Sequence, residues 1–385
     1  PSWHCAARPV PPRRKLTGEL RQAPAPRARL AAAAVSESPP GLDLDALRAF
    51  LSPHVGGVNV SLQAELIAGG RSNLTYIVHD GERRFVVRRP PLAHVLPTAH
   101  DMAREVRMLT ALRGTGIPVP AVIASCDDPS VIGAPFYVMP YVDGHIVRET
   151  LPEQFEDSPA TRRAMSEALI DILVQLHQVV PSGVGLGDFG KPDGFLQRQV
   201  RRWWQQWDAS KTRELPSMEE LRRRLEQTVP AQSAPGIVHG DYRLDNVIFA
   251  PDDPARIVAV LDWEMATVGD PLCDLGLLLV YWADDAAEVA ARTLHGRAIT
   301  VEPGFLRRDQ LRARYAASST RDCTNLDWYI ALGAYKLAII AEGINARFLR
   351  GMTVGEGFEG IGGMVPPIVD GALETLQHLT TTAGG

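Results

Sequence analysis

Cysteine is scarce in this chain, and the few cysteines follow no metal-binding or disulfide pattern. Four cysteines are spread over 385 residues, at Cys5, Cys126, Cys273 and Cys323. Because no C-x-x-C pair and no cysteine–histidine cluster occurs, the sequence indicates neither a zinc site nor a disulfide framework. This cysteine usage favours the reducing cytoplasm as the location.

Long apolar runs and an excess of basic residues are missing as well. The longest apolar run, residues 275–283, is too short to span a bilayer. The net charge of −5 argues against a general nucleic-acid binder. With 45% apolar and 22% charged residues, the composition is that of a soluble globular protein, and 385 residues are enough for two lobes or domains. We therefore expect neither a nucleic acid nor a membrane as partner, while protein partners stay open.

Residues 1–41 differ in composition from the rest of the chain. They are rich in Ala, Pro and Arg, and their acidic residues are Glu19 and Glu37. No apolar segment of the kind found in secretory signals occurs. A transit peptide would be similarly basic, but the proline-rich stretches fit that class badly. We expect a disordered extension, and with Met102 as the first methionine the chain start is compatible with processing or truncation.

The residues from His239 to Asn246, followed by 262–264, carry the strongest chemical signal. Phosphoryl transfer needs one carboxylate that takes the proton of the attacking hydroxyl, here Asp241, and an Asn and a second carboxylate that hold Mg²⁺, here Asn246 and Asp262. Short apolar segments at 247–249 and 257–261 predict a strand pair that returns Asp262 to Asn246. The alternative is a tight turn rich in Asp and Asn.

The spacing of these residues resembles the H-R-D-x-x-x-x-N and D-F-G motifs of protein kinases. Gly240 in place of the Arg, and Trp263-Glu264 after the second Asp, resemble the aminoglycoside phosphotransferase family of small-molecule kinases. The resemblance implies an α+β, protein-kinase-like two-lobed fold. It would have a small antiparallel-sheet N-lobe at 42–143, ending in a hinge, and a mostly helical C-lobe at 144–385 with the catalytic loop and the acceptor pocket.

In the expected N-lobe, the resemblance implies that a glycine turn covers the nucleotide phosphates through Gly69, Gly70 and Ser72. Asp80-Gly81 predicts a hairpin turn after it. Arg88 or Arg89 then stands where kinases carry the phosphate-binding Lys, and Arg88 is favoured when residues 85–87 are aligned with the kinase V-A-I run. Strand alternation sends Arg89 to the opposite face, toward solvent or the neighbouring strand. Glu105 lies on the apolar face of the next helix and should pair with Arg88, the alternative being a boundary residue that reaches solvent.

The segment from Phe136 to Gly144 resembles a kinase hinge. By that resemblance the Val142 N–H and the Pro140 carbonyl would bind the adenine of ATP, and Met139 would line the back of the pocket. GTP is the alternative nucleotide. A buried strand followed by a turn is compatible with the same residues.

Two further residues belong to the expected catalytic lobe. Asp274 matches the kinase Asp that accepts hydrogen bonds from the catalytic loop backbone. Arg243 stands two residues after Asp241 and would stabilise charge on the transferred phosphate. The alternative for Arg243 is a loop residue that pairs with Asp245 or solvent.

The family does not determine the acceptor. A narrower likeness, carried by residues 70–76, 88–91 and 133–137, is to bacterial phosphotransferases akin to the kinase-like domains of acyl-CoA dehydrogenase fusion proteins. The function we expect is transfer of the γ-phosphate from Mg·ATP to a hydroxyl of a hydroxyacyl-CoA, a hydroxy acid or another hydroxylated metabolite. The alternatives are an aminoglycoside O-phosphotransferase and a nucleotide-binding pseudokinase, the latter because the kinase Lys is missing.

Two local clusters bear on the acceptor. An acidic cluster could attract a cationic drug or form a solvated helix face. It consists of Asp284, Asp285 and Glu288. A mixed basic and aromatic cluster could hold an anionic, partly apolar acceptor or form a surface helix with its Trp side chains packed inside. It consists of Arg198, Arg201, Arg202, Trp203, Trp204 and Trp207.

Overall fold

The computed structural model describes residues 38–58, 61–67, 73–92, 101–285, 287–288, 298–352 and 357–382. The expectations for residues 1–37 and for Gly69, Gly70 and Ser72 therefore lie outside the described residues. Described structure begins four residues before the expected start at Leu42, whose N–H donates to the Pro39 carbonyl at 3.0 Å.

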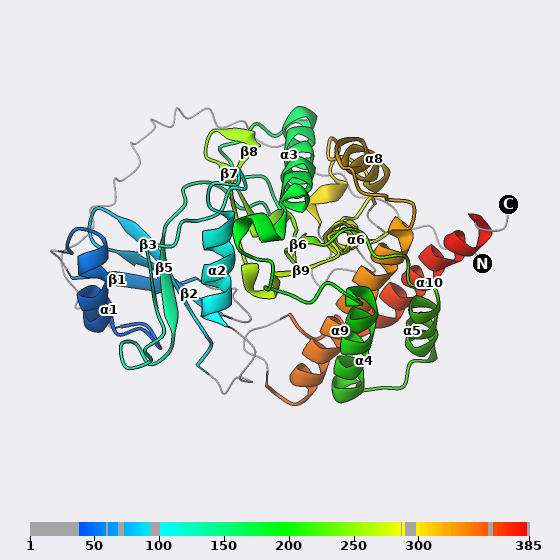
Figure 1. Cartoon of the computed structure of the whole chain (residues 1–385), viewed down its shortest axis with the longest axis horizontal. Helices are drawn as coiled ribbons and strands as arrows, with labels where there is room; N and C mark the ends of the chain where they lie inside the picture. Colours follow the sequence, from blue (N-terminus) through cyan, green and yellow to red (C-terminus); the bar gives the residue numbers. More distant parts are fainter. Residues whose placement is uncertain are drawn as a thin grey trace, which may run out of the picture. The chain divides into compact units, whose positions relative to one another are not determined.

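A five-stranded antiparallel sheet forms the first part of the described chain (Figure 1), in the order β1-β2-β3-β5-β4. Its strands are β1 Gln63–Leu66, β2 Leu74–His79, β3 Arg84–Arg89, β4 Ala124–Cys126 and β5 Phe136–Pro140. The hairpin predicted at Asp80-Gly81 joins β2 to β3. The Asp80 carboxylate accepts the Arg83 N–H at 2.7 Å, and Gly81 has a φ of 92° that favours glycine.

The two faces of the sheet pack against different helices, because alternate strand residues point in opposite directions. Helix α1, Leu44–Leu51, packs against one face through a core that contains Val87 of β3. Asp43 caps α1: its carboxylate accepts the Ala46 N–H at 2.9 Å. Val86, the neighbour of Val87, joins the other core, which contains α2, Met102–Leu112. Helix α2 thus lies on the face of the sheet that Arg88 shares.

The rest of the described chain is mostly helical, with two short strand pairs, β6–β9 and β7–β8. The remaining helices are α3 Pro159–Gln178, α4 Phe195–Ser210, α5 Pro216–Gln227, α6 Leu272–Tyr281, α8 Arg308–Ser318, α9 Leu326–Leu349 and α10 Val365–Thr382. The short strands are β6 Gly236–Val238, β7 Val247–Ala250, β8 Asp253–Val260 and β9 Thr267–Gly269. The 3-10 turns are η1 Ser52–His54, η2 Pro181–Val184, η3 Leu244–Asn246, η4 Trp263–Met265, η5 Ile299–Val301 and η6 Ile361–Met364. No described helix has the length and apolar character needed to cross a membrane.

Helix α9 is the central element of the helical part and packs against α4, α6 and α10. Its close approach to α6 depends on Gly276, where a Cβ atom would meet the Tyr329 carbonyl oxygen at 2.4 Å. The two-lobed, kinase-like α+β fold is confirmed, whereas its division between residues 143 and 144 stays our proposal.

One expectation about the sheet was incomplete. Arg89 does point away from the face that carries Arg88, but it is buried, with only 5% exposure, rather than facing solvent. Its Nη1 donates to the carbonyls of Gly41 and Ile132, the latter at 2.9 Å. These carbonyls belong to the segment before α1 and to the loop before β5. Because a buried guanidinium needs acceptors, Arg89 ties these segments to the sheet.

Arg89 should therefore contribute to stability rather than to activity. We expect Arg89→Ala to lower the free energy of unfolding by about 1–3 kcal/mol, because the two buried carbonyls lose their donor. Urea denaturation measures this loss. Arg48→Ala on the exposed side of α1 is the control and should change little; an equal loss in both variants would contradict the structural role of Arg89.

Candidate active site

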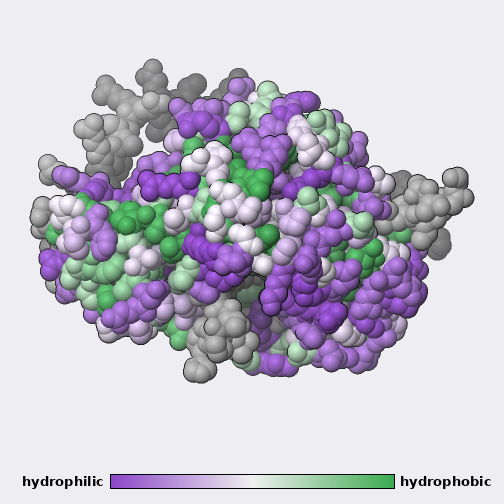
Figure 2. Space-filling view, in the orientation of Figure 1, coloured by the Kyte–Doolittle hydropathy of each residue, from purple (hydrophilic) through white to green (hydrophobic). Residues whose placement is uncertain are grey.

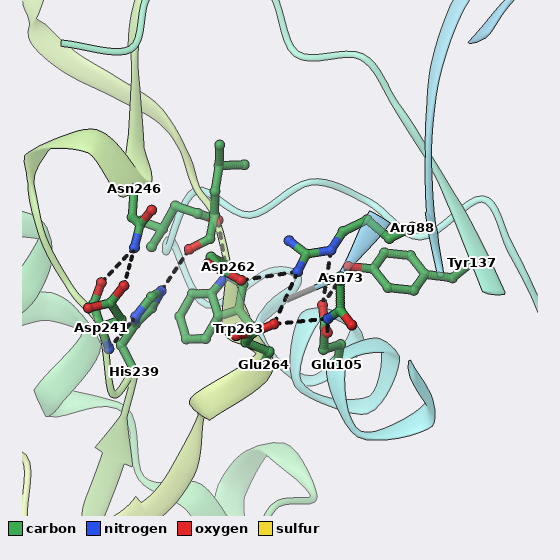
Figure 3. Close-up of polar contacts among 12 residues, drawn as sticks. Asn73, Arg88, Glu105, Tyr137, His239, Asp241, Asn246, Asp262, Trp263 and Glu264 are labelled. Atoms are coloured by element: carbon green, nitrogen blue, oxygen red, sulfur yellow. Dashed lines mark hydrogen bonds and ion pairs between the residues drawn. The ribbon is translucent and has the colours of Figure 1, made fainter. Parts of the chain in front are cut away.

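The loop from His239 to Asn246 is held between two strand pairs (Figure 3). It follows β6 and leads into β7, which pairs with β8. The Leu261 N–H donates to the Asn246 carbonyl at 2.8 Å, so the return of the chain to Asn246 before Asp262 is confirmed. Asn246 and Asp262, 16 positions apart in the chain, are thereby brought close together, as two ligands of one metal ion must be.

Asp274, at the start of α6, holds the loop in place through the loop's backbone N–H groups. Its carboxylate accepts the backbone N–H groups of His239 at 2.6 Å and Gly240 at 2.8 Å, as predicted. It also lies 3.4 Å from Nε2 of the buried His177. Burial alone would raise the pKa of Asp274, but its contacts with His177, His239 and the Gly240 N–H hold that pKa below the ordinary value. The carboxylate is thus kept ionised for a structural role.

Asp241 projects from the loop with both carboxylate oxygens in hydrogen bonds. Oδ2 accepts from Nδ2 of Asn246 at 3.0 Å, and Oδ1 accepts from the hydroxyl of Tyr281 at 3.0 Å. Sequence reasoning missed Tyr281. A signal was present, because Tyr281 lies seven residues after Asp274, two turns along the same helix, and therefore on the same face of α6.

Arg243 adopts the alternative arrangement that the sequence left open. Its Nη2 donates to Asp245 at 2.5 Å, so the guanidinium is paired within the loop. It nevertheless stays beside the loop carboxylate, with Nε 3.8 Å from Asp241 Oδ2 and the guanidinium 4.9 Å from the centre of the Tyr281 ring. Arg243 is therefore near Asp241 without forming a short hydrogen bond to it.

Asp262 is the one described non-glycine residue with a positive φ, 64°. Such a conformation is costly for a residue with a side chain and is typical of functional sites. Asp262 lies two residues after the end of β8 and is the N-cap residue of η4. Oδ1 of Asp262 accepts from Nη2 of Arg88 at 3.0 Å. Figure 3 shows Asp262 between the Asp241–Asn246 pair and Arg88.

The oxygen atoms at this place suit Mg²⁺. Asn246 uses Nδ2 for Asp241, which leaves its Oδ1 as an oxygen ligand, and Asp262 keeps Oδ2 beside the oxygen that Arg88 binds. Mg²⁺ takes one or two such protein oxygens and completes its shell with waters and phosphates. Among the described residues no group of three or more His, Cys, Asp or Glu side chains could hold a metal by itself.

Arg88 joins three acidic residues at the boundary between sheet and helices. Besides its bond to Asp262, its Nε lies 3.5 Å from Glu105 Oε2, and its Nη2 lies 3.8 Å from Glu264 Oε2. The predicted Arg88–Glu105 pair is thus present, although the short hydrogen bond of Arg88 goes to Asp262. Glu105 is buried, as expected for its apolar helix face.

Glu105 has two further donors that sequence reasoning missed. The hydroxyl of Tyr137 donates to it at 2.8 Å, and Nδ2 of Asn73 at 2.9 Å. Asn73 also reaches Glu264 at 3.0 Å. Burial raises the pKa of Glu105 above its ordinary value, while Arg88 and the Tyr137 hydroxyl oppose that rise. The position of Tyr137 on β5, opposite Arg88 in the sheet, brings it here.

The expected hinge follows the end of β5. The Tyr141 N–H donates to the Arg84 carbonyl at 3.0 Å, so the ladder between β3 and β5 continues one residue beyond Pro140. Met139 is buried in the core on the α2 side of the sheet, and Pro140 and Val142 are half-buried. The nucleotide contacts expected of these three residues stay predictions.

A cavity of about 870 Å³ adjoins the catalytic loop. Its lining contains Gly240 of the loop, residues of α4, α6 and α9, and three basic side chains: Arg104, Arg202 and Lys336. Of the mixed cluster on α4, Arg202 and Trp203 line this cavity. Arg198 instead donates to the carbonyls of Lys191 and Asp193, outside it.

The other two Trp side chains of the mixed cluster do not line the cavity. Trp207 is buried, and Trp204 lies against Arg222, whose guanidinium is 4.6 Å from the ring centre. In Figure 2 the surface over α4 and α5 is mostly hydrophilic, which agrees with Arg side chains outside and Trp inside.

Two carboxylates of the acidic cluster are already paired. Arg308 approaches Asp284 at 3.4 Å and also forms an ion pair with Glu288. This pairing weakens the expectation that the cluster attracts a cationic acceptor, because part of its charge is neutralised from within the chain.

The fold and this arrangement define a kinase-like phosphotransferase. The model of the family described as "Phosphotransferase enzyme family" matches residues 63–311, which is more than half of the chain. The chain therefore belongs to the phosphotransferase enzyme family, and this membership makes it a small-molecule kinase by class.

Two curated relatives illustrate the membership. Acyl-CoA dehydrogenase family member 11 from Gallus gallus is 35% identical over 83% of this chain and 41% of its own length. The Homo sapiens protein of that name is 32% identical over 88% of this chain and 44% of its own length. The chain thus spans less than half the length of these relatives.

Among solved structures, a candidate aminoglycoside phosphotransferase from Ralstonia eutropha is 33% identical, with a TM-score of 0.74 over 87% of this chain and 98% of its own. A ternary complex of the aminoglycoside phosphotransferase APH(4)-Ia with AMP-PNP and hygromycin B has a TM-score of 0.55 over 86% of this chain and 98% of its own. At 15% identity, this second likeness supports the fold alone.

Proposed function

We propose that this protein transfers the γ-phosphoryl group of Mg·ATP to a hydroxyl group of a small molecule. The observation that carries the proposal is the meeting of Asp241, Asn246 and Asp262 at one place, through the β7–β8 pair and the strained backbone of Asp262. A turn rich in Asp and Asn would not need this convergence of three residues from different segments.

Asp241 has the role of general base. It accepts the proton of the attacking hydroxyl as the new oxygen–phosphorus bond forms, and the bond to the β,γ-bridging oxygen breaks with ADP as leaving group. Hydrogen bonds from Tyr281 and Asn246 hold its carboxylate in place. Asn246 and Asp262 would hold Mg²⁺, which neutralises charge on the phosphates. We assign Arg243 to charge on the transferred phosphate, which requires it to leave Asp245.

The nucleotide would lie along the sheet. Arg88, positioned by Glu105, would bind the α- and β-phosphates, and Gly69, Gly70 and Ser72 would cover them. The Pro140 carbonyl and the Val142 N–H would bind adenine, and Met139 would line its pocket. ATP is supported by the nucleotide complexes of similarly folded proteins, such as the one with streptomycin and ATP. GTP stays the alternative.

For the acceptor we propose a hydroxyacyl-CoA, a hydroxy acid or another hydroxylated metabolite. The curated relatives that contain a matching segment are named as acyl-CoA dehydrogenases, which supports an acyl compound. An aminoglycoside is the second candidate, because similarly folded proteins bind hygromycin B and streptomycin. The internal pairing of Asp284 and Glu288 with Arg308 weighs against that polycation. Retention of Asp241, Asn246 and Asp262 weighs against a pseudokinase.

Asp241→Asn tests the general base. The substitution keeps the shape of the side chain and removes its charge, so ATP binding should remain while kcat falls by at least ~10²-fold. Steady-state turnover with a screened hydroxyl acceptor measures kcat, and equilibrium titration measures ATP affinity. Turnover near that of the unaltered protein would exclude Asp241 as the base.

Asp262→Ala tests the metal ligand. In the unaltered protein Mg²⁺ should strengthen ATP binding, and the variant should lose that strengthening because Asn246 alone is a weak ligand. Removal of Asp262 also releases Arg88, so binding of metal-free ATP should persist. Titrations with Mg²⁺ and with EDTA separate the two effects. The exposed Asp322→Ala is the control, and unchanged Mg²⁺ dependence in Asp262→Ala would remove this assignment.

Substitution of Arg88 tests whether this Arg takes the phosphate-binding role that a Lys has in kinases. Arg88→Ala should weaken ATP binding and activity strongly, whereas Arg88→Lys should retain part of both, because the charge survives without the bidentate fork. The exposed Arg48→Ala should match the unaltered protein. If Arg88→Ala binds ATP normally and no acceptor is phosphorylated by the unaltered protein, the pseudokinase alternative becomes the better one.

A further inference from the structure

The cavity beside the catalytic loop is lined by basic groups that lack carboxylate partners in the described part of the chain. Arg104 donates to the carbonyls of Phe189 at 3.2 Å and Ala266 at 3.5 Å. Arg202, exposed on α4, and Lys336 on α9 form no ion pair with a described residue either. Three cations thus surround one space of about 870 Å³.

Two carboxylates also line this cavity, but both have other partners. Asp274 accepts the N–H groups of the catalytic loop, and Glu264 accepts from Asn73 and lies 3.8 Å from Arg88. Neither is therefore paired with Arg202 or Lys336. Among the described residues that line the cavity, the charged groups without an ion-pair partner are therefore cations, opposite to what a polycationic acceptor would need.

Lys336 is a cavity cation that contacts the catalytic loop directly. Its ammonium donates to the Gly240 carbonyl, lies 3.9 Å from the Met265 sulfur, and faces the Trp203 ring at 5.5 Å from its centre. A sulfur atom and a ring face are weak partners for an ammonium, which can donate three hydrogen bonds. Burial lowers the pKa of Lys336, while the charges of Asp241 and Asp274 oppose that change. A half-buried cation of this kind is stabilised by an anion in the cavity.

We propose that Lys336 is a specificity-determining residue that binds an anionic group of the acceptor, a carboxylate or a phosphate, with Arg202 as the second cation. The inference rests on the proposed function. Gly240 immediately precedes Asp241, so the ammonium that binds the acceptor also holds the backbone beside the general base. A correctly charged acceptor is thereby bound beside the group that takes its proton.

Three acceptors of one chain length test the inference: a hydroxy acid, its neutral methyl ester, and its coenzyme A thioester. The acid carries a carboxylate and the thioester carries phosphates, so the comparison also identifies the source of the anion. The unaltered protein should prefer at least one anionic acceptor over the ester by at least ~10-fold in kcat/KM. Lys336→Gln should remove most of this preference by raising KM. The matched control is Lys211→Gln, because Lys211 pairs with Asp208 and Glu214 outside the cavity.

Lys336→Met separates binding of the acceptor anion from the hydrogen bond that Lys336 donates to the catalytic loop. Gln keeps a donor for the Gly240 carbonyl and Met does not, so Lys336→Met should lower kcat with the ester more than Lys336→Gln does. A neutral ester preferred by the unaltered protein, or an anion preference retained by Lys336→Gln, would overturn the inference and leave the proposed function intact.

If no acceptor is phosphorylated, the proposed function fails for these compounds, and binding alone decides about Lys336. In titrations with a non-hydrolysable ATP analogue present, at least ~10-fold tighter binding of an anionic compound to the unaltered protein than to Lys336→Gln supports the site. Equal binding by the two proteins, or none, overturns it.

Discussion

The guanidinium of Arg88 is the contact on which the arrangement of the site depends. One side chain on β3 reaches Glu105 of α2, Asp262 at the end of β8, and Glu264 of η4. A buried charge of this kind is tolerated only where several acceptors share it. The same contacts therefore hold the sheet, its helix and the expected metal-binding loop together. An Arg suits this place because its planar guanidinium carries several N–H donors that point in different directions and can reach separate acceptors. The ammonium of a Lys is a compact point charge without this fork.

A second buried charge, Asp274, joins the helical part to the catalytic loop, as Arg88 joins the sheet to the segment around Asp262. It fixes the backbone of His239 and Gly240 from α6, while the last residue of the same helix, Tyr281, holds the carboxylate of Asp241. One helix thus positions both the catalytic loop and the side chain that projects from it. Lys336 of α9 binds the same loop on the side of the cavity. The loop itself is short and polar, so its geometry comes from these surrounding helices.

Family membership and acceptor choice rest on different parts of the molecule. The groups that would handle phosphate come from the sheet, the loop and the β7–β8 pair, which lie within the residues that the family model matches. The cavity is built from α4, α6 and α9, and its described carboxylates have partners, whereas Arg202 and Lys336 form no ion pair with a described residue. One fold can therefore combine phosphate-handling groups with a separate pocket whose charge selects the acceptor.

The sequence by itself determined the features that depend on neighbours along the chain. Asp43 as a helix cap, the Asp80-Gly81 hairpin and the opposite directions of Arg88 and Arg89 follow from local geometry. The fold and the candidate site were implied by the resemblance to a known family that Asp241, Asn246 and Asp262 carry. Only the tertiary structure decided that Arg89 is buried and bonds to the Gly41 carbonyl, that Arg88 bonds to Asp262, and that Tyr281 and Lys336 reach the loop. These contacts join elements far apart in the chain, and their distances depend on how helices and strands pack, which residue spacing does not encode.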